Sequence, residues 1–118
     1  MVVARAGGKD GHADRVFRAL ADRTRRGVIR QAMNGRLSVS ALARLYPMST
    51  TAMQKHVAVL QKAGLVHLTR HGREQRVQTE IDTIAEAQVL LAEFEQLWRG
   101  RLERIGDVLA EPVRGGRR

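Results

Sequence analysis

The stretch MSTTAMQKHVAVLQKAGLV, residues 48–66, decides the fold because its two sides suit different surroundings. On a helical wheel that turns about 100° per residue, most of its apolar side chains gather on one side. The other side carries small, polar or basic side chains, namely Thr51, Gln54, Lys55, Ala58 and Lys62. The pattern predicts a helix over residues 49–63 with one packed face and one face that is presented to a partner.

The flanking segments predict three shorter helices before this one. Helical spacing of apolar residues begins at Ala13, and Asp22 is well placed to cap a second helix. Ser38 and Ser49 are placed to cap the third and fourth helices, and Gly64 closes the fourth.

A basic hairpin is expected after Gly64, because the period of the apolar residues falls there from about 3.6 to about 2. The segments LVHLTR and QRVQTE predict two strands, joined by a turn in HGRE. The hairpin tip carries Arg70, His71, Arg73 and Arg76, with Glu74 as the counter-charge. Short helices followed by a basic hairpin predict a winged helix-turn-helix, mainly α with a small β-hairpin wing, in the order α-α-α-α-β-β-α.

One long amphipathic helix is predicted over residues 82–110. Apolar residues recur there at seven-residue steps, at Ile84, Leu91, Trp98 and Ile105. They belong to an apolar stripe that is wider than packing against a single neighbouring element of the same domain requires. We therefore expect a tail over residues 1–12, one domain over residues 13–110 that ends in this helix, and a basic tail over residues 111–118.

The net charge of +9 is distributed unevenly along the chain. Residues 1–78 hold fifteen Lys and Arg against four Asp and Glu, a net charge of +11. Residues 79–111 hold three Arg against eight acids, a net charge of −5. This split indicates that the basic part faces a polyanion, while the acidic helix faces protein or solvent.

The composition argues against several classes of protein. The chain has no cysteine, which removes disulfides, thiolate metal sites and cysteine nucleophiles. It has no glycine-rich phosphate loop and no recognisable Ser/His/Asp grouping, so we expect neither enzymatic activity nor a cofactor. No apolar run approaches the roughly 20 residues that cross a bilayer, and the first residues lack the apolar core of a secretion signal. We therefore expect a cytoplasmic protein that does not enter the membrane.

The presented face of the helix at residues 49–63 suits base edges and phosphates. Thr and Gln side chains can hydrogen-bond bases without filling the major groove, and lysines can meet phosphates. We therefore predict double-stranded DNA as the partner of this helix and of the wing at residues 70–76. The predicted DNA-contacting residues are Ser49, Thr50, Thr51, Gln54, Lys55, His56, Lys62, Arg70, His71, Arg73 and Arg76.

Other interpretations of this surface stay open. The polar side of the helix also fits an ordinary solvated face, and the basic surface also fits an architectural protein that binds DNA of any sequence. A module that binds only protein is a third alternative. His56 lies on the apolar side of its helix, so a packed structural role suits it as well as a phosphate contact.

The same segments resemble the ArsR/SmtB-type winged-helix repressors. LADRTRRGVI (residues 20–29) is similar to the family's second-helix signature, and RHGREQRVQ (residues 70–78) is similar to its wing. SVSALARLYPMSTTAMQKHVAVLQKAGLV (residues 38–66) is similar to its helix-turn-helix. The resemblance covers roughly residues 13–110. It implies a homodimeric transcriptional regulator, usually a repressor whose DNA affinity falls when an effector arrives.

Two departures from the metal-sensing members of that family indicate a member that senses no metal. The arsenic and cadmium sensors carry Cys-Val-Cys where this chain has Ser38-Val39-Ser40, and hydroxyls are poor ligands for soft metals. The other well-known site needs Asp and His on the last helix, yet all four histidines precede residue 72. We expect no metal site, and the effector is unknown.

The final helix and the first helix form the predicted dimer interface. The resemblance implies this pairing, and the width of the apolar stripe suggests it. A two-fold dimer predicts an inverted-repeat operator. The alternative is that the final helix folds back on its own domain. The predicted interface residues are Val16, Phe17, Leu90, Leu91, Phe94, Leu97, Trp98, Leu102, Ile105 and Leu109.

Overall fold

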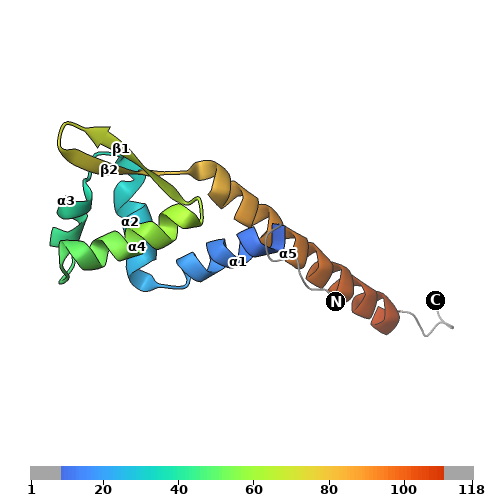
Figure 1. Cartoon of the computed structure of the whole chain (residues 1–118). Coiled ribbons are helices and arrows are strands. Elements are labelled where there is room, and N and C mark those ends of the chain that lie inside the picture. Colours follow the sequence, from blue (N-terminus) through green and yellow to red (C-terminus); the bar gives the residue numbers. More distant parts are fainter. Residues whose placement is uncertain (1–8, 111–118) are drawn as a thin grey trace. The chain divides into compact units, whose positions relative to one another are not determined.

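The computed structural model describes residues 9–110 of the chain (Figure 1). The elements are α1 Lys9–Leu20, α2 Arg23–Gln31, the short 3-10 helix η1 Ala32–Asn34, α3 Val39–Arg44, α4 Thr50–Lys62, β1 Val66–His71, β2 Glu74–Thr79 and α5 Ile81–Ala110. This order confirms the predicted winged helix-turn-helix with a two-stranded wing. Residues 1–8 and 111–118, which hold most of the two predicted tails, lie outside the described residues.

The first helix begins at Lys9, four residues before the predicted start at Ala13. The assignment of residues 9–12 to a tail is therefore wrong. A tertiary contact accounts for the difference, because Nε2 of His12 lies 3.0 Å from Oε1 of Glu86 in α5. Contacts of this kind order a helical turn whose local sequence gives only a weak signal.

The corner between α1 and α2 is held by side chains of α2. Asp22 caps α2, and its carboxylate accepts a hydrogen bond from the backbone N–H of Arg25 at 2.9 Å. The guanidinium groups of Arg25 and Arg26 donate to carbonyls in the last turn of α1. These bonds are Arg25 to Ala19 at 2.8 Å, Arg25 to Arg18 at 3.1 Å and Arg26 to Leu20 at 2.8 Å. They satisfy helix-end carbonyls that the helix itself bonds poorly or not at all.

The helices α3 and α4 form the helix-turn-helix, and each begins at its predicted cap. The hydroxyl of Ser38 accepts from the backbone N–H of Ala41, and that of Ser49 accepts from the N–H of Ala52, both at 3.1 Å. The chain leaves α4 through Gly64, whose φ of +77° is a conformation that favours glycine. Local sequence therefore sets both ends of α4.

The wing is an antiparallel hairpin in a register that runs from Val66 opposite Thr79 to His71 opposite Glu74. Its turn contains Gly72 with a φ of +64°, again a conformation that favours glycine.

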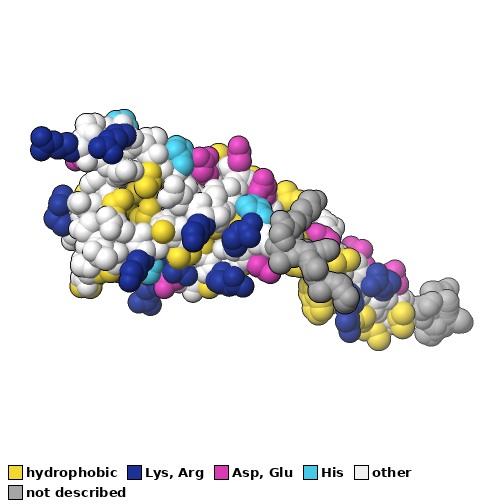
Figure 2. Space-filling model, in the orientation of Figure 1, with side chains coloured by type: hydrophobic (Ala, Val, Ile, Leu, Met, Phe, Trp, Pro, Cys, Tyr) yellow, Lys and Arg dark blue, Asp and Glu magenta, His cyan; other side chains and the backbone are white. Residues whose placement is uncertain are grey.

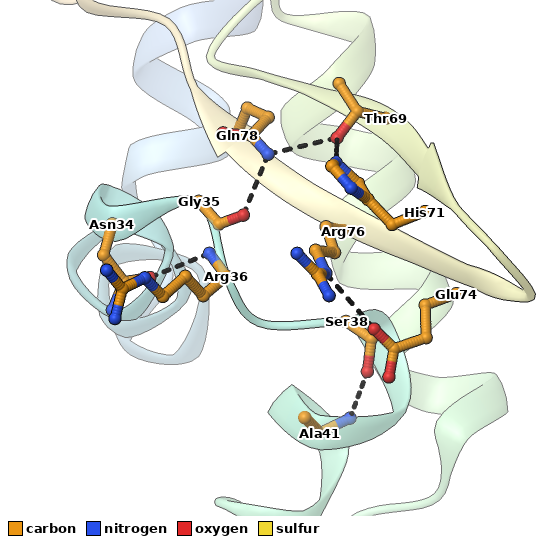
Figure 3. A network of polar contacts seen from close by, with 10 residues as sticks. All are labelled: Asn34, Gly35, Arg36, Ser38, Ala41, Thr69, His71, Glu74, Arg76 and Gln78. Atoms are coloured by element: carbon orange, nitrogen blue, oxygen red, sulfur yellow. Dashed lines mark hydrogen bonds and ion pairs between the residues drawn. The ribbon is translucent and has the colours of Figure 1, made fainter.

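Polar contacts tie the base of the wing to the helices (Figure 3). The side-chain nitrogen of Gln78 donates to the carbonyl of Gly35 at 2.9 Å and to the hydroxyl of Thr69 at 3.1 Å. Gly35 has a φ of +70°, a conformation that favours glycine, and a Cβ there would lie 2.1 Å from the side-chain oxygen of Gln78, so that side chain would have to shift. The backbone N–H of Val77 donates to the carbonyl of Leu37 at 3.0 Å. These bonds fix the wing beside the helix-turn-helix.

One hydrophobic core joins these elements. Its largest fully buried side chains come from α2, α3, α4, both strands and the residue that precedes β1: Val28, Leu42, Met53, Leu60, Leu65, Val66 and Val77. Burial of a side chain of this size contributes roughly 1.5–3 kcal/mol, so the core holds α4 firmly against its neighbours.

Two compact units divide the chain within α5, the first ending at Ala87 and the second beginning at Gln88. In the first unit the hydroxyl of Thr83 donates to the carbonyl of Gly64 at 2.6 Å, and Ile84 and Ala87 pack against the core. In the second unit most apolar side chains of α5 are exposed to solvent. Within residues 9–110 every helix is too short or too polar to span a bilayer.

Candidate nucleic-acid interface

The helix α4 has the two faces that its sequence predicts. Met53, Val57 and Leu60 are buried in the core. Val59 is an apolar residue at the edge of this packed face, and it is 39 % exposed. The other face is exposed along its whole length, and it includes these predicted DNA-contacting residues: Thr50, Thr51, Gln54, Lys55 and Lys62. Ser49 is exposed as well, although its hydroxyl already caps the helix.

A hollow of about 470 Å³ lies where α3, α4 and the wing meet. Three of the predicted contact residues line it, one at the start of α4, one a turn later and one at the wing: Thr50, Gln54 and Arg73. The hollow therefore brings together side chains from two elements that the sequence separates by about twenty residues.

Six other polar residues line the hollow and were not among the predicted DNA contacts: Ser38, Ser40, Arg44, Gln61, Glu74 and Gln75. Gln61 follows Gln54 by two helical turns, so a helical wheel places both residues on the same face and could have predicted Gln61. Ser40 and Arg44 belong to α3, and only the packing of α3 against α4 turns them toward the hollow.

The wing presents a group of cations, and Figure 2 shows Lys and Arg side chains projecting from the hairpin tip. Arg70, His71 and Arg73 are exposed, as predicted. The ring of His71 hydrogen-bonds the hydroxyl of Thr69, with Nε2 3.2 Å from Oγ1. The tip therefore offers at least two arginines to a polyanion.

Arg76 differs from the other wing cations. It is half-buried, and its Nε donates to Oε1 of Glu74 at 3.2 Å (Figure 3). Among the described cations of the wing, Arg76 is therefore the one that pairs with the predicted counter-charge Glu74. The reason is the alternation of side chains along a strand. Residues 74 and 76 lie two apart on one strand, so their side chains share a face of the hairpin.

His56 is turned away from the exposed face of α4 and toward α2. Its side chain is 24 % exposed, and its Nδ1 lies 3.5 Å from a terminal nitrogen of Arg25 and 3.9 Å from Oδ2 of Asp22. The hydrogen bond from the backbone N–H of Arg25 lowers the pKa of Asp22, and the charge of Arg25 acts in the same direction. This environment favours the structural alternative for His56.

The predicted interface residues fall into two groups. Val16 is 2 % exposed in the core of the single chain, so it has almost no surface left for a partner, and Phe17 is half-buried. In α5, Leu90 is half-buried. The remaining predicted residues of α5 are between 45 and 80 % exposed: Leu91, Phe94, Leu97, Trp98, Leu102, Ile105 and Leu109.

The described residues contain no group of three or more His, Cys, Asp or Glu side chains that could hold a metal ion. Three histidines instead lie near single carboxylates: His12 near Glu86, His56 near Asp22 and His67 near Glu80. That the chain senses no metal stays a prediction.

A helix-turn-helix that presents polar side chains beside a basic hairpin defines the class of the winged helix-turn-helix proteins. Comparison with solved structures agrees. An "ArsR-like Transcriptional Regulator" from Rhodococcus sp. RHA1 is similar over 90 % of this chain and 99 % of that one, with 31 % identity and a TM-score of 0.75. The chain therefore belongs to the ArsR family of transcriptional regulators.

Two further comparisons are consistent with this family. The HTH-type transcriptional regulator Rv2034 from Mycobacterium tuberculosis is 45 % identical over 53 residues, which are 45 % of this chain and 50 % of that protein. The "homodimeric winged helix-turn-helix DNA-binding domain" of a "possible ArsR-family transcriptional regulator" from Mycobacterium bovis is 22 % identical, covers 81 % of this chain and 90 % of that one, and has a TM-score of 0.63. This last likeness concerns the fold alone. The chain matches no protein-family model.

Proposed function

We propose that the chain is a sequence-specific DNA-binding regulator that represses transcription as a homodimer on an inverted-repeat operator. The observation that carries the proposal is the hollow, where Thr50 and Gln54 of α4 face the same space as Arg73 of the wing. Thr and Gln can read base edges, and Arg binds phosphate. A recognition helix in the major groove with a wing on the adjacent backbone needs these groups on one surface.

The charge around this surface supports a polyanionic partner. Arg44, Lys55, Lys62 and Arg70 are exposed on the elements that border the hollow. Among the described residues that line it, Glu74 is the one acid. Phosphate contacts of such cations supply the salt-dependent part of DNA affinity, and the polar side chains of α4 supply the sequence preference.

The exposed side chains of residues 88–110 support assembly with a second copy. Phe94, Leu97 and Trp98 are each more than half exposed, and Figure 2 shows hydrophobic side chains gathered on this helix. A continuous apolar surface of this kind marks an interaction site in a soluble protein. The proposed occupant is the same helix of a second chain. Binding of such a two-fold dimer to an inverted repeat requires its two recognition helices to lie about one DNA turn, roughly 34 Å, apart.

The test is selection of bound fragments from a random duplex pool at about 150 mM salt, where nonspecific binding is weakened but persists. We expect an inverted repeat with half-sites about one turn apart. A Gln54→Ala protein selected in parallel should recover a motif that is degenerate at one position of each half-site. Retention of DNA without any motif would overturn the proposal in favour of an architectural protein.

Two further measurements separate the parts of the proposal. Light scattering on the free protein should give the mass of a dimer, and a monomeric mass would contradict the α5 interface. Transcription in vitro from a promoter that carries the recovered operator should fall as protein is added. A rise in transcript would identify an activator.

A further inference from the structure

His56 links the recognition helix to the corner between the first two helices. Its Nδ1 lies 3.5 Å from a terminal guanidinium nitrogen of Arg25. The same guanidinium donates to two carbonyls at the end of α1, those of Ala19 at 2.8 Å and Arg18 at 3.1 Å. Three helices therefore meet at one arginine.

The chemistry of this contact fixes the roles of its atoms. A guanidinium has five N–H donors and no acceptor, so Nδ1 of His56 must accept the hydrogen bond from Arg25. A ring that accepts at Nδ1 carries its proton on Nε2. The carbonyls of α1 hold the Arg25 side chain in place independently of His56. The contact with His56 therefore positions α4 relative to α1 and α2.

Direction distinguishes this contact from the rest of the α4 packing. Met53, Val57 and Leu60 bury the packed face, but apolar contacts tolerate small rotations of a helix about its axis. A hydrogen bond weakens steeply when its angle changes. Since Gln54 lies only two residues from His56, a rotation of α4 moves the presented side chains as it breaks this bond.

We propose that His56 is a positioning residue, which sets the rotation of α4 through Arg25 and so controls DNA specificity without touching DNA. The part that concerns DNA rests on the proposed function. The contact with Arg25 does not, because it exists in the free protein and can be measured there.

The first experiment is a double-mutant cycle on the DNA-free protein, with His56→Ala, Arg25→Ala and the double variant. We expect the effects on the folding equilibrium constant to differ from additivity by about three- to tenfold. Arg26→Ala is the matched control, because Arg26 bonds the same end of α1 through Leu20 and makes no described hydrogen bond to His56. The Arg26 cycle should be additive. Additivity in the Arg25 cycle would overturn the proposal whatever the protein does with DNA.

The second experiment uses side chains that replace one ring nitrogen each. The amide oxygen of Asn lies near the position of Nδ1, and that of Gln lies near Nε2. We expect His56→Ala to weaken operator binding about tenfold and random-duplex binding less than about twofold. His56→Asn should restore operator affinity, and His56→Gln should not. Rescue by Gln alone would mean that His56 contacts DNA through Nε2 and would overturn the proposal.

The two experiments keep this inference distinct from the proposed function. A wild-type protein without sequence preference refutes the proposed function and the part of the inference that concerns specificity, while the cycle with Arg25 still decides the contact. Coupling in the free protein together with unchanged operator affinity in His56→Ala would overturn the positioning role alone.

Discussion

Replacing Glu74 with Gln tests the electrostatics of the hollow. The side chain of Glu74 is 53 % exposed, lines the hollow and accepts from Nε of Arg76. The replacement removes a negative charge from the proposed DNA-contacting surface and frees a guanidinium, so we expect about one additional phosphate contact per protomer. At about 0.15 M salt one contact contributes about fivefold in affinity, which gives about 25-fold for a dimer on DNA of any sequence. Folding should change little, since exposed ion pairs contribute about 0–1 kcal/mol.

Fluorescence anisotropy of the operator and of a random duplex, titrated between about 50 and 300 mM salt, measures this effect. The plot of log affinity against log salt should steepen by about one unit per protomer for both duplexes. Asp14→Asn is the matched control, because it changes the net charge equally on an exposed residue of α1 that does not line the hollow. An equal change in both variants, or none in Glu74→Gln, would refute the assignment of the hollow as the DNA surface.

Three other substitutions test separate parts of the molecule. Gln54→Ala should weaken operator binding by about 1–3 kcal/mol and relax specificity at one base pair, measured by competition with single-base operator variants. Trp98→Asp should lower the mass in light scattering from dimer to monomer, with loss of operator binding as its consequence. The pKa of Asp22 is lowered in the folded state. Its carboxylate therefore stabilises the fold fully when the pH is above the unfolded-state pKa of about 3.9, and this stabilisation is lost as the pH falls through the lower folded-state pKa. Asp22→Ala should therefore cost about 0.5–2 kcal/mol in urea unfolding at pH 7, and the difference from the wild type should narrow as the pH falls below about 3.9.

Local signals explain why much of the fold could be predicted. Ser38 and Ser49 cap their helices, and Gly64 closes α4 because its φ is positive. Each of these features depends on residues that are close together in the sequence. The two faces of α4 were also predictable, since burial follows the helical period wherever a single core covers one side.

Contacts between distant segments explain what could not be predicted. The first turn of α1 is ordered by a contact between His12 and Glu86, which lie 74 positions apart. The role of Arg25 depends on its contacts with both α1 and α4. Neither the contact of His12 with Glu86 nor the contacts of Arg25 produce a periodic pattern in the sequence. Arg76 is an exception, because the alternation of side chains along a strand already placed it on the same face as Glu74.

The side chains on the presented face of α4 carry the strongest argument for a binding role. Thr51 is exposed and has no described hydrogen bond to another side chain, and threonine is a poorer helix former than alanine by up to about 0.7 kcal/mol. Gln54 is exposed as well and adds nothing to the core. Stability alone would favour alanine here, as the chain uses at Ala58. The opposite face of the same helix is packed in the core, which holds α4 in place. Its exposed face carries side chains whose hydrogen-bonding groups are accessible to a partner. That combination is what direct recognition of base edges requires.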